Sequence, residues 1–329
     1  MNRREALTAF GVTAAVLVVV VAVGCGGTGG NFSIDTVIGQ PNGGILGSTR
    51  DIILFVSVRT GNAEIWGVNA AGGDPIRLTA SGIQDQSPAW SPDGDNIVFS
   101  SSWVTTADLL RASVHNNTLI NQDGDVAYFY QMTSRQGSNF GPAWSVNDRI
   151  AFASDRDDPN FEIYTMDING QDVQRLTENT ASDNSPKWSP NGSEIVFSSN
   201  RTSSTPDVFI MNADGSNVRQ ITFSTQGWAS LAPEFSPDGQ RIAYVLQQPN
   251  GDRDIYTMDV NGGDQLRLTD DGWGQHHPSW SPDGTKIAYE RFGHAQVQDI
   301  WVMNADGSGK LQLTADIDMD AQPAWSPAT

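Results

Sequence analysis

The adjacent histidines His276 and His277 are the residues of this chain with the clearest capacity for metal or acid–base chemistry. Imidazole nitrogens bind divalent cations, and several histidines around one point would hold such an ion. Five other segments are related to the one that begins here, and their equivalent positions carry no histidine: Gln86 and Ser87, Phe140 and Gly141, Asn184 and Ser185, Leu231 and Ala232, and Ala321 and Gln322. The sequence therefore excludes a three-histidine site. We expect no metal and no cofactor, with His276 or His277 as a lone ligand the alternative.

Carboxylates offer a second chemistry. Asp85, Asp183 and Asp320 stand at equivalent positions of three related segments, and acid–base catalysis on a glycan would combine such groups with His276 or His277. Nucleophilic catalysis has less support, because the chain has no G-x-S-x-G motif and its single cysteine lies near the N-terminus. We therefore expect a binding protein and keep a glycan-cleaving enzyme as the alternative.

Each of these residues precedes a copy of one repeated word, and the copies define the architecture. The aromatic residue of the word recurs in steps of 44 to 54 residues, at Trp90, Trp144, Trp188, Phe235, Trp280 and Trp325. One full copy, HPSWSPDGTKIAYE, starts at His277. A repeat of this length, built of strand-like segments, is typical of β-propeller blades.

Four short segments rich in aromatic and β-branched residues make up each repeat. In the repeat around Trp144 they are the P-x-W word and residues 150–153, 162–166 and 173–177. Such segments between turn residues predict strands. The connecting SPDG and NADG words suit tight turns and supply too few oxygen ligands for calcium. We expect one four-stranded antiparallel blade per repeat.

The fourth segment ends in an apolar residue and threonine six times, which predicts six blades. The first repeat lacks a P-x-W word and starts with residues 52–58, whereas the chain ends with a spare Pro-Ala-Trp at residues 323–325. We therefore expect an all-β, six-bladed propeller whose C-terminal strand joins the N-terminal blade and closes the ring. In the second repeat, residues 108–110 are predicted as the third strand and residues 116–125 as an insertion.

Two recurring side-chain features are expected to be structural. The repeated aromatic residues are predicted to fill the gaps between neighbouring blades. An acidic residue opens every third strand, and an arginine closes the second strand in four repeats, at Arg59, Arg156, Arg201 and Arg291. We expect these opposite charges to pair across the hairpin that joins the two strands.

The repeat unit resembles that of TolB-type, WD-repeat-like propellers, which reads roughly P-x-W-S-P-D-G-x-x-I-A-F, then D-I-Y-x-M-N-x-D-G, then R-x-L-T. The resemblance covers residues 52–327. TolB itself is periplasmic, binds a peptidoglycan-associated lipoprotein and has an α/β domain ahead of its propeller. This chain has a tether at that place, so the resemblance implies the fold and leaves the partner open. Some propellers of this general type are polysaccharide lyases, and that likeness implies the glycan alternative.

The N-terminal residues predict export and a lipid anchor. Arg3 and Arg4 precede an apolar run at residues 14–23 that is too short to span a bilayer and is typical of a signal peptide, here residues 1–24. The run ends in Ala-Val-Gly-Cys, which resembles a bacterial lipobox and implies lipid attachment to Cys25. Residues 25–49 then form a lipidated, Gly-rich tether ahead of the propeller at residues 50–329. We expect the protein on the periplasmic or surface face of the bacterial envelope.

The charge and the loops between repeats define the expected partner. A net charge of −19 argues against nucleic acid as a partner and leaves the lipid on Cys25 as the contact with the membrane. The loops ahead of each P-x-W word should emerge on one face, where their residues differ between repeats. Aromatic groups beside carboxylates suit a basic peptide or a sugar. We predict a site there for an envelope protein or peptide, or for a glycan, formed by Asp85, Asn139, Phe140, Asp183, Trp228, Trp273, Gln275, His276, His277 and Asp320.

Overall fold

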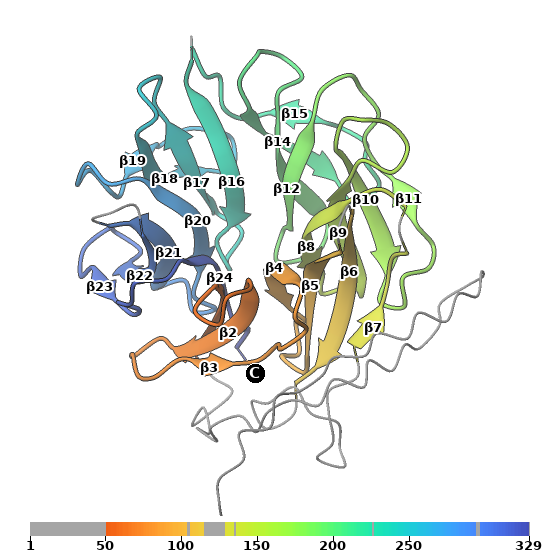
Figure 1. The fold of residues 1–329 in the computed structure, drawn as a ribbon. Helices are drawn as coiled ribbons and strands as arrows, with labels where there is room; N and C mark the ends of the chain where they lie inside the picture. The colour runs from red at the N-terminus through yellow and green to blue at the C-terminus, as the bar shows by residue number, and fades with distance from the viewer. Residues whose placement is uncertain are drawn as a thin grey trace, which may run out of the picture.

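Six four-stranded antiparallel sheets form a ring around a common axis (Figure 1). The computed structural model describes residues 51–103, 106–114, 129–134, 136–225, 227–293 and 297–328. This confirms the predicted six-bladed propeller. The described part of the chain has no helix of the length and hydrophobicity needed to cross a lipid bilayer. The predicted signal peptide, Cys25, the tether and the insertion at residues 116–125 lie outside the described residues.

The strands are numbered along the chain, and those of each blade are named from the axis outwards. Blade 1 contains β24 (Asp320–Trp325), β1 (Ile52–Ser57), β2 (Glu64–Asn69) and β3 (Ile76–Arg77). Blades 2 and 3 contain β4 (Gln84–Trp90), β5 (Asn96–Trp103), β6 (Thr106–Ser113) and β7 (Phe129–Gln131), then β8 (Asn139–Trp144), β9 (Arg149–Ser154), β10 (Glu162–Asp167) and β11 (Gln174–Arg175). Blades 4 and 5 contain β12 (Asp183–Trp188), β13 (Glu194–Ser199), β14 (Asp207–Asn212) and β15 (Arg219–Gln220), then β16 (Ala229–Phe235), β17 (Arg241–Gln247), β18 (Arg253–Asp259) and β19 (Leu266–Arg267). Blade 6 contains β20 (Gln275–Trp280), β21 (Lys286–Phe292), β22 (Gln298–Asn304) and β23 (Leu311–Gln312).

The ring closes at blade 1, where the last strand pairs with the first. Strand β24 is antiparallel to β1, with Trp325 opposite Ile53 and Asp320 opposite Ser57. Beyond the strand, the backbone N–H of Ser326 donates to the carbonyl of Ile52 at 2.8 Å. The predicted closure by the C-terminal strand is confirmed, as is the placement of the third strand of blade 2 around residues 108–110.

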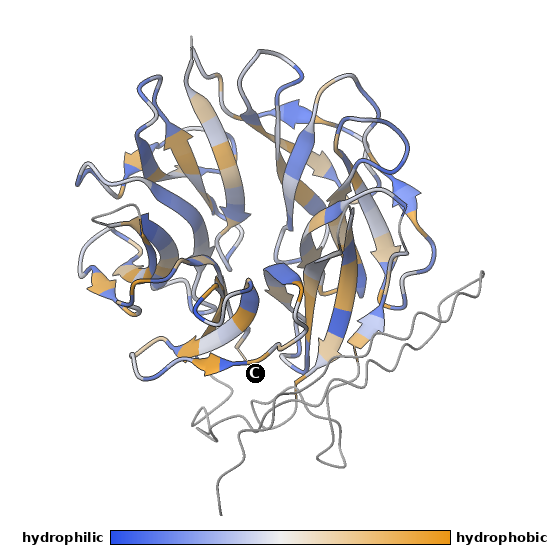
Figure 2. Cartoon of the chain, in the orientation of Figure 1, coloured by the Kyte–Doolittle hydropathy of each residue, from blue (hydrophilic) through white to orange (hydrophobic). Residues whose placement is uncertain are grey.

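The core lies between the blades. Successive residues of a strand point to opposite faces of the sheet, and in β1 both faces are covered. Ile53 and Phe55 pack with blade 6, whereas Leu54 and Val56 pack with blade 2. Hydrophobic residues accordingly concentrate in the strands, and the connecting loops are mostly hydrophilic (Figure 2). Each of six apolar clusters joins two neighbouring blades.

The repeated aromatic residues belong to these clusters, as the sequence predicts. Trp280 and Trp325 are buried, and Trp90, Trp144 and Trp188 are partly buried against the cluster of the adjoining interface. The indole N–H of Trp188 donates to the carbonyl of Ala143 in the neighbouring blade at 3.1 Å. These residues are therefore part of the scaffold.

A buried threonine beyond the fourth strand accepts a backbone N–H of the third strand in every blade, and in blades 1 to 5 it also donates to the acid that opens the third strand. In blade 1 the hydroxyl of Thr79 accepts from the backbone N–H of Ile65, and Arg77 pairs with Glu64 at 2.6 Å. Arginine has the same role in blades 3 and 5, whereas glutamine donates to the acid in blades 2, 4 and 6. The expected pairing of these acids with the arginines that close the second strands is wrong, because the fourth strand supplies the partner.

Removal of β24 should unfold the protein. Deletion of residues 320–329 exposes the inner edge of β1 and two apolar blade faces, so we expect loss of the cooperative thermal transition. The milder change Trp325→Ala should cost about 3 to 5 kcal/mol of unfolding free energy, as for other buried tryptophans. Thermal and urea unfolding followed by circular dichroism measure both. A deletion variant that melts like the full chain would contradict the closure.

Asp299 should make stability depend on pH. It is buried next to Gln312, its Oδ1 has no hydrogen-bond partner among the described residues, and burial together with Asp320 and Asp316 raises its pKa from 3.8 to about 6. Between pH 4 and pH 6 the folded state keeps a proton that the unfolded state releases, so stability falls as the pH rises through this window. Asp299→Asn should therefore raise the unfolding free energy at pH 7.5 by about 1 to 3 kcal/mol, and the gain should vanish below about pH 4.

The matched control is Asp207→Asn. Asp207 holds the same place in blade 4 but accepts hydrogen bonds from Thr222 and from the backbone N–H of Ser224. Neutralising it weakens charge-assisted bonds, so it should not stabilise the fold. Urea unfolding of both variants from pH 4 to pH 8 measures the difference, and equal effects of the two changes would refute the role of Asp299.

Candidate functional site

The two faces of the ring carry different connections. Because the strands of a blade are antiparallel, the loops ahead of the innermost strands emerge on one face together with the loops between second and third strands. We call this the loop face and define it by residues 78–83, 132–134, 136–138, 176–182, 221–225, 227–228, 268–274 and 313–319. The opposite face, called the turn face, carries the repeated SPDG and NADG turns. Sequence variation between blades is thus concentrated on the loop face.

The polar residue that starts each innermost strand is buried. The six residues at this position have exposed fractions of 0 to 1% and are Asp85, Asn139, Asp183, Ser230, Gln275 and Asp320. The arginine that closes the second strand of the blade bonds to three of them: Arg59 to Asp320 at 2.8 Å, Arg201 to Asp183 at 2.6 Å and Arg156 to Asn139 at 2.8 Å. Five of the residues predicted to contact a partner therefore lie beneath the loop face and hold its loops in place.

The electrostatics of this buried ring follow from its local partners. Asp85 accepts from Ser101 at 2.6 Å and from Ser81 at 2.8 Å, and burial raises its pKa. Burial also raises the pKa of Asp320, although Ser57 and Arg59 oppose the shift. Gln275 replaces the acid in blade 6 and donates to Asp271 at 2.7 Å. The ring stabilises loops, and its members are not open to a large ligand.

The predicted aromatic residues are partly buried on the loop face. Phe140 packs against Phe161 with ring centroids 5.9 Å apart, and the guanidinium of Arg291 lies 5.5 Å from the ring centre of Trp273. Trp228 is half-buried at the end of its loop. All three side chains are thus partly exposed.

Sequence reasoning missed the most exposed apolar residues of the same loops. Phe223 is 74% exposed, Ile317 is 89% exposed and Met319 is 37% exposed. Each stands in a loop where turn-forming polar residues would be expected. An apolar residue at such a position is the sequence feature that could have identified these exposed side chains. Ile317 and Met319 alternate with Asp316 and Asp318, so apolar and acidic groups share one loop.

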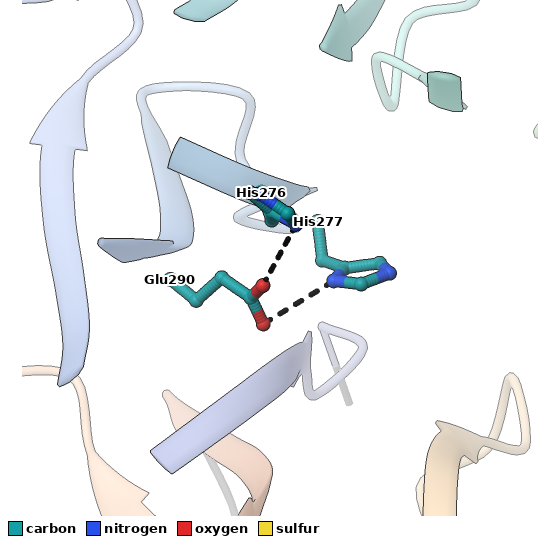
Figure 3. A group of neighbouring side chains, drawn as sticks. All are labelled: His276, His277 and Glu290. Atoms are coloured by element: carbon teal, nitrogen blue, oxygen red, sulfur yellow. Dashed lines mark ion pairs between the residues drawn. The ribbon is translucent and has the colours of Figure 1, made fainter. Parts of the chain in front are cut away.

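The histidine pair lies on β20 against a glutamate of β21. His276 is opposite Glu290 in the strand pairing, and a β-bulge follows it. His277 is the bulged residue, with a φ of 45°. Nδ1 of each ring lies 3.2 Å from a different carboxylate oxygen of Glu290 (Figure 3). Sequence reasoning also missed Glu290, because its segment resembles an ordinary second strand.

Burial controls the charges of this cluster. Glu290 is 2% exposed and accepts from the backbone N–H of Gln322 at 2.9 Å. Burial opposes its ionisation, but His277, His276 and that N–H prevail and lower its pKa. His276 contacts the guanidinium of Arg253 and the ring of Phe292. Burial lowers the pKa of His276 to about 4, so this imidazole is neutral at physiological pH.

Two cavities lie along the inner strands. One, of about 190 Å³, is lined by residues of blades 4, 5 and 6 that include Ser185, Ala232, His276 and His277. The other, of about 380 Å³, opens at the turn face between the ends of all six inner strands and the turns that follow them. The first cavity borders the only histidines among the described residues. Of the two cavities, it is therefore the one whose lining can bind a metal ion or transfer a proton through an imidazole.

Comparisons with known proteins agree with this architecture. An uncharacterized protein of Agrobacterium fabrum is 28% identical over 201 residues, covering 58% of this chain and 64% of the relative. The Tol-Pal system protein TolB of Desulfosudis oleivorans is 32% identical over 134 residues, covering 41% of this chain and 28% of the relative. The matches thus span less than two thirds of the length of either relative.

Solved structures show the same fold at low identity. TolB from Acinetobacter baumannii has a TM-score of 0.70 at 23% identity, covering 84% of this chain and 67% of that chain. An oligogalacturonate lyase from Vibrio parahaemolyticus has a TM-score of 0.53 at 16% identity, covering 80% and 74%. The model of the TolB beta propeller domain family matches residues 128–328. The chain belongs to the TolB β-propeller domain family.

Proposed function

We propose that this protein is an envelope-anchored binding module that docks a protein or peptide partner on its loop face. In this proposal residues 1–24 direct export, the lipid on Cys25 anchors the chain, and the tether at residues 25–49 gives the propeller reach. The sequence similarity to a Tol-Pal system protein supports a role in an envelope assembly. The partner itself is left to experiment.

Exposed apolar side chains among carboxylates are the observation that carries this proposal. Phe223 and Ile317 contribute little to the packing of the fold, since most of each side chain is in water, and Met319 is partly exposed on the same face. Burying such groups against a partner is favourable by roughly 25 cal/mol per Å² of apolar area. Exposed apolar groups at loop tips are therefore suited to a protein interface.

The charge of the face indicates the chemistry of the partner. Glu178, Asp270 and Asp318 lie in loop-face segments of a chain with a net charge of −19 and form no ion pair with a described residue. Electrostatic complementarity then favours a peptide or protein surface with Lys or Arg beside apolar side chains. Phe140, Trp228, Trp273, His276 and His277 would contribute contact area at the rim of the same site, with the buried polar ring positioning their loops.

Glycan cleavage is the competing function, and burial disfavours it. Asp85, Asp183 and Asp320 would have to reach a substrate, but each has an exposed fraction of 0%, and Asp183 and Asp320 are held by Arg201 and Arg59. The likeness to an oligogalacturonate lyase is one of fold. Binding without turnover is therefore the function that the geometry supports best.

Charge substitution on the loop face should abolish partner capture. The full-length protein, cross-linked in envelope extract, should retain a partner that the double variant Phe223→Asp, Ile317→Asp loses by roughly tenfold or more, since each change removes an apolar contact and adds a charge. Val146→Asp is the matched control, because Val146 is 55% exposed on the turn face. Quantitative mass spectrometry of the captured proteins provides the measurement. Equal losses in both variants, or reproducible polysaccharide cleavage that needs the loop face, would refute the proposal.

The anchor should depend on Cys25 alone. Cys25→Ala removes the thiol to which the lipid would attach, so the protein should move from the membrane fraction to the soluble fraction and stop incorporating labelled fatty acid. Fractionation of cells with immunoblotting measures the shift, with Cys25→Ser as a second thiol-free variant. Unchanged membrane association of both variants would contradict lipid anchoring.

A further inference from the structure

Blade 6 departs from the repeat at three positions that meet in space. Where blade 6 has His276, the other blades have Gln86, Phe140, Asn184, Leu231 and Ala321, and across the strand pair from these residues stand Ser100, Ala153, Ser198, Val245 and Val56. Glu290 is the carboxylate at this cross-strand position in blade 6. The fold is built five times without this group, so stability of the blade does not require it.

The β-bulge brings both imidazoles to one carboxylate. Adjacent residues of a regular strand point to opposite faces, which would separate His276 from His277. The positive φ of His277 breaks this alternation, and both Nδ1 atoms face Glu290 (Figure 3). Every blade has a positive φ at this position, so the bulge is a property of the scaffold that blade 6 uses for a different purpose.

Glu290 is a buried charge without a fixed cation. No lysine or arginine among the described residues forms an ion pair with it, although Arg253 is near enough to interact with its charge, and its direct contacts are the two imidazoles and the N–H of Gln322. Other buried carboxylates either pair with arginine, as Glu64 does with Arg77, or accept hydrogen bonds from neutral hydroxyl and amide groups, as Asp85 does from Ser101. Buried charges are as a rule paired or bound to a metal. In addition, Nδ1 of His277 is buried and has no hydrogen-bond partner among the described residues, although it lies 3.2 Å from Glu290.

We propose that His276, His277 and Glu290 bind a divalent transition-metal cation of the zinc type. The three candidate ligand atoms lie within 4.8 Å of one another. Ligands at about 2.0 to 2.2 Å from zinc stand up to about 4 Å apart, so small side-chain rotations complete the set. The side chain of His277 is 41% exposed and has the freedom to make that adjustment.

The donor set selects the metal. Two imidazole nitrogens and one carboxylate oxygen suit zinc, nickel or cobalt, whereas calcium and magnesium take oxygen ligands. Three protein ligands leave the fourth position of a tetrahedral ion open, and the cavity of about 190 Å³ that both histidines line has room for water or a small ligand there. The site thus has a ligand set of the kind that keeps one exchangeable position.

Arg253 is a competing cation. Its guanidinium contacts the ring of His276, with one nitrogen 3.1 Å from Nδ1, and has to turn away when a metal binds. Arg253 therefore weakens the site both by its charge and by its position. This predicts an unusual result, namely that loss of an arginine strengthens binding of a cation.

Isothermal titration of the full-length protein with zinc chloride tests the site. We expect one zinc ion per chain, a rise in Tm with zinc, and little heat with magnesium or calcium chloride. His277→Ala and Glu290→Gln should weaken zinc binding by roughly 10- to 100-fold or more. Arg253→Gln should tighten it by roughly tenfold, because a repelling charge is removed. His115→Ala, which changes a histidine of another repeat, should bind zinc like the wild type.

The outcomes separate this site from the proposed partner face. His277→Ala alters an exposed side chain and Glu290→Gln keeps the shape of a buried one, and circular dichroism checks that both variants fold. Zinc that binds wild type and His277→Ala equally, or no heat up to millimolar zinc, overturns the metal site. Neither result affects partner capture, which is measured on Phe223 and Ile317.

Discussion

The structure depends on the fact that each blade is apolar on both faces. A sheet such as β24-β1-β2-β3 cannot bury Ile53 and Leu54 by itself, because these residues point in opposite directions. Each blade therefore needs a neighbour on either side, and six blades satisfy this need only as a closed ring. The pairing of Trp325 with Ile53 follows from this constraint, since without it blade 1 lacks its inner strand.

The same constraint divides the residues of the loop face into two groups. Polar side chains that enter the apolar ring need hydrogen-bond or ionic partners, which accounts for the contacts of Asp183 with Arg201 and of Asp320 with Arg59. Side chains beyond the ring are released from that requirement. The exposed positions of the loops, such as those of Phe223 and Ile317, can therefore carry different residues in different blades. His277 belongs to both groups, because its Nδ1 is buried and part of its side chain is exposed.

The fold could be predicted from the sequence because its signal is repeated six times. The spacing of Trp90 and its equivalents defines the blades, and the spare Pro-Ala-Trp word defines the closure. The side-chain partners could not be predicted, because they depend on cross-strand register. Ser57 lies opposite both Glu64 and Asp320, and sequence proximity favours Glu64 as the partner of Arg59, although the arginine reaches Asp320. Glu290 was missed for the same reason, since only the pairing of β20 with β21 reveals His276 as its neighbour.

The seam between β1 and β24 also determines when the molecule can finish folding. Ile52 and Ser326 bond across a separation of 274 residues, whereas blades 2 to 6 are built from contacts within single repeats. Closing so long a loop carries a large entropic cost and is slow compared with local hairpins. The first blade therefore stays incomplete until the last residues of the chain are available. A chain threaded across a membrane from its N-terminus would thus complete its ring only after translocation had ended.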